Sequence, residues 1–166
     1  MSKHHHHDDR RTVGCAILTV SDTRTQADDR SGALIRELLE GAGHRIVDQE
    51  ILPDEPSVVA AEVARMADEP AIEAILVTGG TGLAARDTTY EALDGLLEKR
   101  LDGFGELFRF LSYEEIGPAA MLSRAAGGVI GTTVVFSMPG STAACRLAVE
   151  RLILPQLGHV AGLLAE

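Results

Sequence analysis

A glycine-rich loop, Thr78-Gly79-Gly80-Thr81-Gly82, is a segment that could bind a ligand through its backbone. Its glycines carry no side chain that would keep a ligand away, and its threonines add hydroxyl groups. Exposed amides in such a loop can form a nest for an anion. A tight turn that needs positive φ explains the same glycines, so both interpretations stay open. The loop is not the dinucleotide-binding fingerprint, because it lacks the GxGxxG spacing and follows the third predicted strand.

Two aspartates, Asp54 and Asp87, could hold a divalent cation. Mg²⁺ takes oxygen ligands and usually binds through one or two carboxylates together with phosphates. Asp54 stands just before Pro56 and could instead cap a helix. Asp87 could stabilise a helix N-terminus, although Thr88 and Glu91 have the spacing of a capping box and would already cap that helix. The pair therefore predicts a magnesium site, with helix capping as the alternative.

Polar residues also follow the first and the last predicted strands. Ser21 and Asp22 come directly after residues 13–20, and Pro139-Gly140-Ser141 comes directly after residues 133–138. Ser141 begins a predicted helix, whose N-terminal amides and dipole favour a carboxylate or a phosphate. A plain N-cap explains the same serine. Both segments are therefore candidates for ligand binding.

Charged residues elsewhere could complete a site for an anionic ligand. Glu106 lies in Gly103-Phe104-Gly105-Glu106, where the flanking glycines suggest an acid held at a helix start and facing a site. An acid favoured there by the helix dipole is the alternative. Arg86, Arg109 and Arg124 could offset the charge of ligand phosphates, or could face solvent or bridge subunits.

Short apolar strands alternate with amphipathic helices along the chain. Strands are predicted over residues 13–20, 45–51, 72–77, 127–131 and 133–138, and helices over 34–42, 56–67, from about 89, over 103–116 and over 144–153. This alternation indicates an α/β fold with a mostly parallel sheet. The last two strands are close enough to pair as a hairpin, so one strand runs antiparallel. Since such sheets bind ligands outside the carboxyl ends of their strands, all the loops above are predicted to meet at one edge.

The composition excludes several classes of protein. The chain has 166 residues, 15 Lys plus Arg and 25 Asp plus Glu, and a net charge of −10, which argues against nucleic acid or an anionic membrane as a partner. No run of 18 apolar residues predicts a spanning helix. Cys15 and Cys145 are predicted to be reduced core thiols of a cytoplasmic protein. Residues 1–11, with His4 to His7, are predicted to be a disordered tag or natural tail, and residues 12–166 a single domain.

Five ordered motifs carry a resemblance to a known family. They are Ile17 to Asp22, the Gly79 to Gly82 loop with Arg86 to Thr89, Gly103 to Glu106, Ser123-Arg124-Ala125, and Met138 to Ser141. These motifs resemble the molybdopterin adenylyltransferase family, MogA and MoaB. The stretch from Phe104 to Cys145 is most similar to the MoaB branch, and the resemblance covers about residues 12–160.

The resemblance implies a three-layer αβα fold, with one antiparallel edge strand, and a role in molybdenum cofactor biosynthesis. The implied reaction transfers AMP from MgATP to the terminal phosphate of molybdopterin and releases pyrophosphate. Asp54 and Asp87 match the family's catalytic aspartates and are the expected Mg²⁺ ligands. The residues expected to bind substrate are Ser21, Asp22, Thr78, Gly79, Gly80, Thr81, Gly82, Glu106, Ser123, Pro139, Gly140 and Ser141. Family members form trimers or hexamers, and other proteins of the pathway are possible partners.

One departure from the family pattern leaves alternatives open. Ala143 and Ala144 stand where relatives frequently carry a lysine. A non-catalytic molybdopterin carrier or regulator, a molybdate-inserting protein and a general phosphate-binding scaffold therefore remain alternatives to the adenylyltransferase. The segment from Phe104 to Tyr113 holds most of the aromatic residues, which either pack internally or form a subunit interface.

Overall fold

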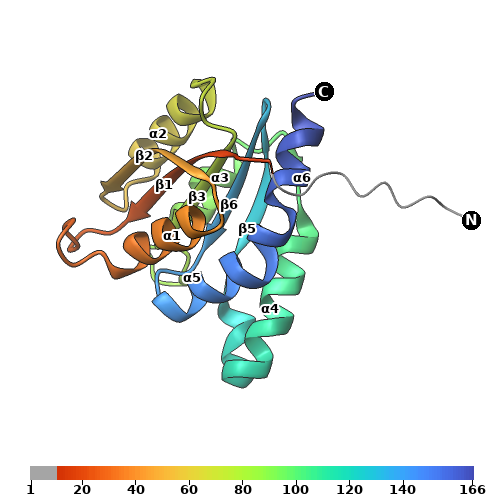
Figure 1. The fold of residues 1–166 in the computed structure, drawn as a ribbon. Coiled ribbons are helices and arrows are strands. Elements are labelled where there is room, and N and C mark those ends of the chain that lie inside the picture. Colours follow the sequence, from red (N-terminus) through yellow and green to blue (C-terminus); the bar gives the residue numbers. More distant parts are fainter. Residues whose placement is uncertain (1–10) are drawn as a thin grey trace, which may run out of the picture.

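The computed structural model describes residues 11–166, and these form a six-stranded sheet covered by helices on both faces (Figure 1). The strands are β1 (Gly14–Val20), β2 (Arg45–Leu52), β3 (Ala74–Thr78), β4 (Lys99–Arg100), β5 (Ala126–Ile130) and β6 (Thr133–Met138). Their order across the sheet is β2-β1-β3-β6-β5-β4. All adjacent pairs up to β6 are parallel, whereas β5 is antiparallel to both its neighbours. The predicted three-layer, mostly parallel fold is confirmed.

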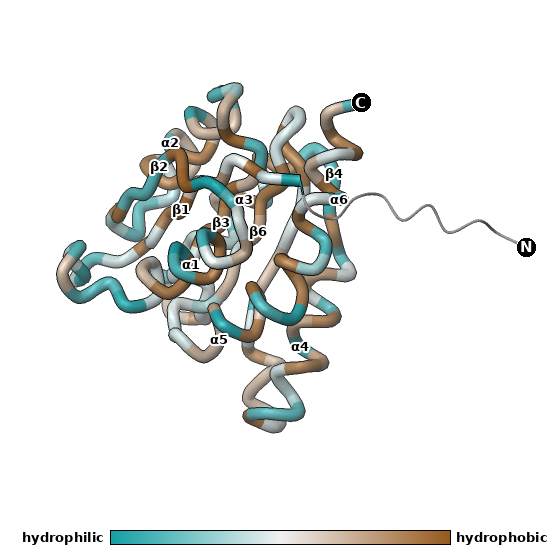
Figure 2. Tube along the Cα trace, in the orientation of Figure 1, coloured by the Kyte–Doolittle hydropathy of each residue, from teal (hydrophilic) through white to brown (hydrophobic). Residues whose placement is uncertain are grey.

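The helices divide into two layers. They are α1 (Arg30–Gly41), α2 (Pro56–Asp68), α3 (Thr89–Asp94), α4 (Asp102–Ile116), the 3₁₀ turn η1 (Gly117–Leu122), α5 (Thr142–Ala148), the π-helical turn η2 (Val149–Ile153) and α6 (Leu154–Leu164). Core residues of α1, α4, α5 and α6 pack on one face of the sheet, and those of α2 and α3 pack on the other. Figure 2 shows the alternation of apolar and polar turns along these helices.

Alternation along the central strands builds the two cores. Cys15 and Ile17 of β1 belong to the core under α1, whereas Ala16 and Leu18 belong to the core under α2. Successive side chains of a strand point to opposite faces, so a strand covered on both faces consists mostly of apolar residues. Every residue of β1 and β3 is buried. This arrangement explains the continuous apolar runs that identified these strands in the sequence.

The sequence analysis did not predict the edge strand β4. It consists of Lys99 and Arg100 alone, which pair with Val129 and Gly128 of β5. Two exposed cations have no apolar alternation from which a strand could be recognised, and charges are typical of an edge that must not pair further. As a consequence, the antiparallel strand β5 is one position inside the edge of the sheet.

The C-terminal helical segments form one continuous helix, Thr142–Leu164, of 23 residues. Its π-helical turn ends just before Pro155. Pro155 has no N–H to donate to the carbonyl of Arg151 and its ring would crowd that carbonyl, which the wider turn relieves. By length and composition the helix could cross a membrane. Here one side of it contributes Cys145, Leu157 and other residues to the core, which accounts for its apolar character.

Both cysteines are fully buried free thiols. Burial raises the pKa of the Cys15 thiol from 9.0 to about 12, and burial also raises the pKa of the Cys145 thiol. We expect iodoacetamide at about pH 8 to leave both unmodified in the native protein and to label both after unfolding, as measured by mass spectrometry. The folded state binds the Cys15 proton more tightly, so its contribution to stability should disappear as pH rises from 9.0 towards 12. Native labelling would contradict the burial of these thiols.

Candidate functional site

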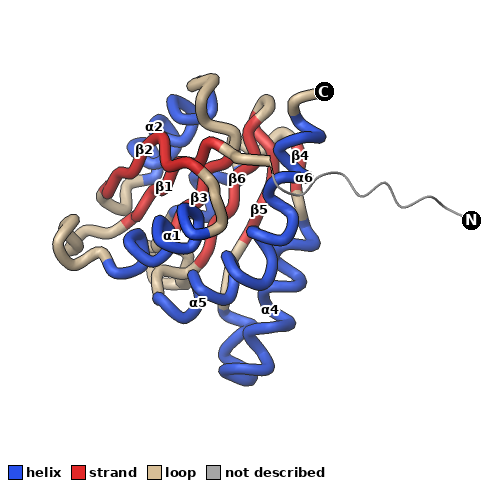
Figure 3. The backbone as a smooth tube through the Cα atoms, in the orientation of Figure 1, coloured by secondary structure: helices blue, strands red, loops and turns tan. Residues whose placement is uncertain are grey.

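Loops that follow several parallel strands meet at the carboxyl edge of the sheet, where Figure 3 shows them as tan segments. The Ser21 amide donates a hydrogen bond of 2.8 Å to the carbonyl of Leu52, which joins the ends of β1 and β2. The Thr78 hydroxyl donates one of 3.1 Å to the carbonyl of Pro139, which joins the ends of β3 and β6. The structure therefore brings together the segments that the sequence predicted at one edge.

Asp54 lies among these loops and does not cap a helix. Its Oδ1 accepts hydrogen bonds from the amide and the hydroxyl of Thr88, at 3.4 and 3.1 Å. Its own amide donates to the Asp22 carboxylate at 3.1 Å. The N-cap residue of α2 is Glu55, which makes no side-chain cap bond. Within residues 11–166, no hydrogen bond uses Asp54 Oδ2, so this oxygen is available to a ligand.

Asp87 closes a short turn ahead of α3. Its Oδ2 accepts a 3.1 Å hydrogen bond from the amide of Ala84, and its amide returns one of 2.9 Å to the Ala84 carbonyl. Thr88 is the N-cap residue of α3 but makes no side-chain cap bond, because its hydroxyl is directed to Asp54. The predicted capping box at Thr88 and Glu91 is therefore wrong. In its place, Thr88 links the segment of Asp87 to Asp54.

The conformation and packing of the glycine loop require its glycines, as the turn interpretation predicted, and ligand binding by the loop stays a prediction. Gly79 and Gly80 have φ values of 99° and 66°, which favour glycine. A Cβ on Gly79 would overlap the carbonyl of Val20, and a Cβ on Gly80 would overlap Thr89 Oγ1 and lie 2.8 Å from Asp54 Oδ2. The loop is thus a tight turn that also makes space beside a carboxylate.

Thr89 is a polar residue of the site that the sequence analysis missed. Its side chain is completely buried under the loop, next to Gly80. Among residues 11–166, its Oγ1 is one of two buried side-chain polar atoms without a hydrogen-bond partner. Buried polar groups are normally paired, so an unpaired hydroxyl beside an available carboxylate oxygen is suited to a polar ligand or a water. Thr89 lies in the motif from Arg86 to Thr89, but nothing in that motif separates it from Thr88 as a site residue.

The three arginines considered as phosphate-binding cations have different roles in the structure. Arg86 forms an ion pair with Asp22, although its side chain is 71% exposed. Arg109 donates to the carbonyl of Ala125 at 3.1 Å and contacts that of Ser123 at 3.5 Å. Arg124 binds carbonyl oxygens of the glycine loop. Of the three, only Arg86 has a largely exposed guanidinium that could turn towards a bound anion.

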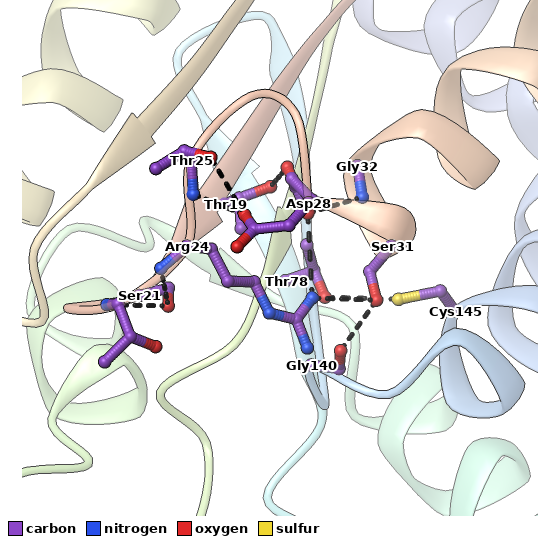
Figure 4. Close-up of polar contacts among 12 residues, drawn as sticks. Thr19, Ser21, Arg24, Thr25, Asp28, Ser31, Gly32, Thr78, Gly140 and Cys145 are labelled. Atoms are coloured by element: carbon purple, nitrogen blue, oxygen red, sulfur yellow. Dashed lines mark hydrogen bonds and ion pairs between the residues drawn. The ribbon is translucent and has the colours of Figure 1, made fainter.

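A fourth arginine, Arg24, belongs to a polar network between the β1–α1 loop and the turn after β6 (Figure 4). Its guanidinium donates to Ser31 Oγ at 3.3 Å and pairs with the buried carboxylate of Asp29 at 3.6 Å. Ser31 in turn donates a 2.7 Å hydrogen bond to the carbonyl of Gly140. The sequence analysis named Gly140 but missed Arg24, Asp29 and Ser31, because Ser31 and Gly140 are 109 positions apart and only the fold brings them together.

Buried Asp29 organises the start of α1. Its Oδ1 accepts from the amide of Gly32 at 3.0 Å, and its Oδ2 accepts from the hydroxyl of Thr19 at 2.6 Å. At the start of the same loop, the Ser21 hydroxyl accepts hydrogen bonds from the amides of Thr23 and Arg24. These bonds hold the β1–α1 loop in a defined shape, with the Arg24 guanidinium beside the Gly140 turn.

In the turn after β6, Ser141 is the N-cap residue of α5, which is one of the two roles considered for it in the sequence. Ser141 Oγ accepts a 3.2 Å hydrogen bond from the amide of Ala144. Cys145 lies beneath the turn and contacts the hydroxyl of Thr78 at 3.1 Å. Ala143 is exposed and Ala144 is half-buried, so the place of the frequent family lysine carries no cation. Anion binding by Ser141 stays a prediction.

Two predicted site residues lie farther along the sheet. Glu106 is exposed on α4, and within residues 11–166 no hydrogen bond or ion pair joins it to the other predicted site residues. Ser123 precedes Arg124, and its hydroxyl accepts a 3.4 Å hydrogen bond from the amide of Ala125. Gly105 is needed for packing, since a Cβ there would lie 2.6 Å from the Ala125 carbonyl. The structure thus gives the glycine beside Glu106 a packing role.

The residues at this edge fit a hard divalent cation. Asp54 Oδ2 and Asp87 Oδ1 accept no hydrogen bond within the described chain, and both carboxylates approach glycines of the loop. A Cβ on Gly82 would lie 2.6 Å from the Asp87 carboxylate, as one on Gly80 would crowd that of Asp54. Carboxylate oxygens together with substrate phosphates are the usual Mg²⁺ ligands. The one acidic cluster of three close carboxylates in residues 11–166 lies elsewhere and consists of Asp48, Glu50 and Glu62. Arg65 already forms ion pairs with two of them, Asp48 and Glu62.

Comparisons with known proteins cover nearly the whole chain. The family model "Probable molybdopterin binding domain" matches residues 16–159. Molybdenum cofactor biosynthesis protein B of Halalkalibacterium halodurans is 55% identical over 151 residues, which are 90% of this chain and 89% of the relative. Its namesake from Bacillus subtilis is 50% identical over 149 residues, 89% of this chain and 88% of the relative.

Solved structures give the same result. A crystal structure of Molybdenum cofactor biosynthesis protein B matches with a TM-score of 0.92 at 50% identity, covering 94% of this chain and 98% of that one. The tungsten cofactor synthesizing protein MoaB from Pyrococcus furiosus matches with a TM-score of 0.85 at 36% identity, covering 94% of this chain and 99% of that one.

Proposed function

We propose, from the premise that this chain belongs to the MoaB family of molybdenum cofactor biosynthesis proteins, that it is a cytoplasmic molybdopterin adenylyltransferase. In the proposed reaction, an oxygen of the terminal phosphate of molybdopterin attacks the α-phosphorus of ATP. The bond from that phosphorus to the bridging oxygen breaks, and pyrophosphate leaves. The products are adenylyl-molybdopterin and pyrophosphate.

One observation carries this proposal. Asp54 and Asp87 are joined through Thr88, each keeps one carboxylate oxygen outside the hydrogen bonds of the described residues, and both border the glycine loop. Transfer between two phosphate groups needs no nucleophile from the protein. It needs two polyanions held in line and their charge balanced. A glycine-rich loop leaves room for the two polyanions to approach its backbone, and the two carboxylates beside it could position a cation between them.

The chain's own residues supply binding and orientation. The glycine loop and the Pro139-Gly140-Ser141 turn would hold phosphates through amides. Arg24, which pairs with Asp29, and Arg86, which pairs with Asp22, are the cations at this edge that would offset the phosphate charge. Asp54 and Asp87 would hold Mg²⁺, which supplies charge neutralisation at the phosphates when bound. The net charge of −10 does not conflict with polyanionic substrates, because amides and a bound cation act locally.

The proposal is tested by incubating the protein with molybdopterin and MgATP. We expect adenylyl-molybdopterin and pyrophosphate to form, and chelation of Mg²⁺ to stop the reaction. Molybdopterin binding without ATP binding in calorimetry would contradict the proposal and favour a non-catalytic carrier or regulator. Molybdate-dependent consumption of adenylyl-molybdopterin, without its formation, would contradict it in favour of molybdate insertion.

We further propose that the protein is a homo-oligomer, a trimer or a hexamer. Phe104 and Phe108 pack in the core, which is the first of the two alternatives for the aromatic segment. Other apolar residues of α4 and η1 are more than half exposed. They are Leu107, Phe110, Tyr113, Ile116, Met121 and Leu122. Six largely exposed apolar residues on one helix and the turn that follows it are typical of an interaction site, and we propose that a second copy of the chain covers them.

Changing Phe110 and Tyr113 together to aspartate should convert the oligomer to a monomer, because desolvated charges would oppose the contact. Light scattering at micromolar concentration measures the change. Glu114→Gln, on the exposed part of the same helix, is the matched control and should leave the assembly intact. A monomeric wild-type protein at that concentration would overturn the proposed interface.

A further inference from the structure

The backbone around Asp87 is held by one side chain from a distant segment. Arg124 precedes β5 and reaches three carbonyl oxygens of the glycine loop and the turn that follows it. Its Nε donates to Thr81 at 3.2 Å, and its Nη2 donates to Gly82 at 2.7 Å and to Asp87 at 2.9 Å. A single guanidinium thus ties both ends of the segment that carries Asp87.

Arg124 is itself held in this orientation by the first turn of α3. Its Nη1 forms an ion pair with Glu91, and its guanidinium lies 5.3 Å from the ring centroid of Tyr90. Only 23% of its side chain is exposed. Contacts on the face and on the edge leave the guanidinium little freedom, so the carbonyl oxygens that it binds are kept in a fixed relation to α3.

These contacts argue against a direct role of Arg124 at ligand phosphates. A guanidinium has five N–H donors. Three of them are used on carbonyl oxygens and one on Glu91. The bond to Asp87 involves the main-chain carbonyl only. Arg124 therefore fixes the backbone of Asp87 without using its carboxylate as a hydrogen-bond acceptor.

We infer that Arg124 is a positioning residue, which holds the glycine loop and Asp87 in the arrangement that the site requires. The inference rests on the proposed adenylyl transfer, to which Arg124 would contribute only through Asp87 and the loop. A planar fork with several donors suits three carbonyl oxygens, whereas a lysine ammonium is a compact point charge. This gives a function to the Ser123-Arg124-Ala125 motif.

Steady-state kinetics of three variants test the inference. Arg124→Ala should lower kcat by about 10- to 100-fold with little change in the KM for molybdopterin, because displaced groups cost rate more than binding. Arg124→Lys should stay close to Arg124→Ala. Glu91→Gln keeps the carbonyl bonds and should lose less than about threefold. Full activity of Arg124→Lys would show that charge alone matters, and would overturn the inference.

A double variant shows whether Arg124 acts through Asp87. Arg124→Ala combined with Asp87→Asn should be no slower than Asp87→Asn alone, because residues that act as a unit are not additive. Additive losses would contradict the inference. Arg65→Ala, which breaks an exposed ion-pair cluster on α2, is the matched control and should leave the rate unchanged.

Amide hydrogen exchange supplies a readout that does not depend on activity. The amides of Ala84, Asp87 and Thr89 are hydrogen-bonded within this segment. In Arg124→Ala they should exchange at least about tenfold faster, while amides of β1 and β3 keep their wild-type protection. An inactive wild-type protein would refute the proposed function, but the exchange measurement would still test whether Arg124 holds this segment. Unchanged exchange in Arg124→Ala would refute the inference about Arg124.

Discussion

Asp87→Asn is expected to lower kcat/KM for adenylyl-molybdopterin formation by at least about 100-fold, a loss of roughly 3 kcal/mol of transition-state stabilisation. The change removes the negative charge that would hold Mg²⁺ but keeps the shape of the side chain. The amide oxygen can still accept the Ala84 hydrogen bond. The turn ahead of α3 should therefore persist, so the loss would report on chemistry and not on folding.

Asp54→Asn should have an effect of the same size, because its available oxygen lies beside the glycine loop. Glu55→Gln is the matched control. This exposed neighbour makes no cap bond, and its substitution should leave the rate within about twofold. Product formation is followed by chromatography, and urea unfolding checks that each variant is folded. Wild-type activity in Asp87→Asn would remove this aspartate from the proposed mechanism.

Gly79→Ala is expected to lower the free energy of unfolding by roughly 2–4 kcal/mol and to abolish activity. Two costs combine here. The residue has φ of 99°, and its Cβ would overlap the backbone carbonyl of Val20 at the end of β1. A backbone oxygen of a central strand cannot move aside as a flexible side chain can. The loop would have to shift, and with it the carboxylate positions on both sides.

Gly131→Ala separates these two costs. Gly131 has φ of 57° in the hairpin between β5 and β6, and a Cβ there would meet nothing within 4 Å. Its substitution should cost only about 1–2 kcal/mol, the cost of a left-handed conformation, and should leave the activity unchanged. Urea unfolding measures both variants. If Gly79→Ala cost no more than Gly131→Ala, the close approach to Val20 would not be a constraint.

Much of the architecture could be read from local patterns. Continuous apolar runs predicted β1 and β3, because a strand buried on both faces carries mostly apolar side chains. The gathering of the loops at the carboxyl edge followed from parallel topology alone. The short strand β4 could not be found, since its pairing with β5 leaves no trace in the types of its two residues.

Some residues of the candidate site could likewise be identified from the sequence, and others only from the structure. Asp54, Asp87 and the glycine loop were identifiable, because they lie in segments that follow strands of a parallel sheet, where such folds bind ligands. The partners of these residues were not. Thr88 has the spacing of a capping box but turns its hydroxyl to Asp54, 34 positions away. An N-cap and a cross-loop bond need the same residue type, so only distance in space separates them.

The sequence by itself determined the α/β class, the edge of the sheet at which the loops meet and the residue types available there, because these depend on periodicity and on the direction of the strands. Only the tertiary structure decided how each polar group is used. It directs Arg124 to three backbone carbonyls, joins Arg24 to Ser31 and leaves the Thr89 hydroxyl buried without a partner among residues 11–166. Hydrogen bonds require that segments far apart in the chain are placed to within a few tenths of an ångström, and no local pattern encodes that placement.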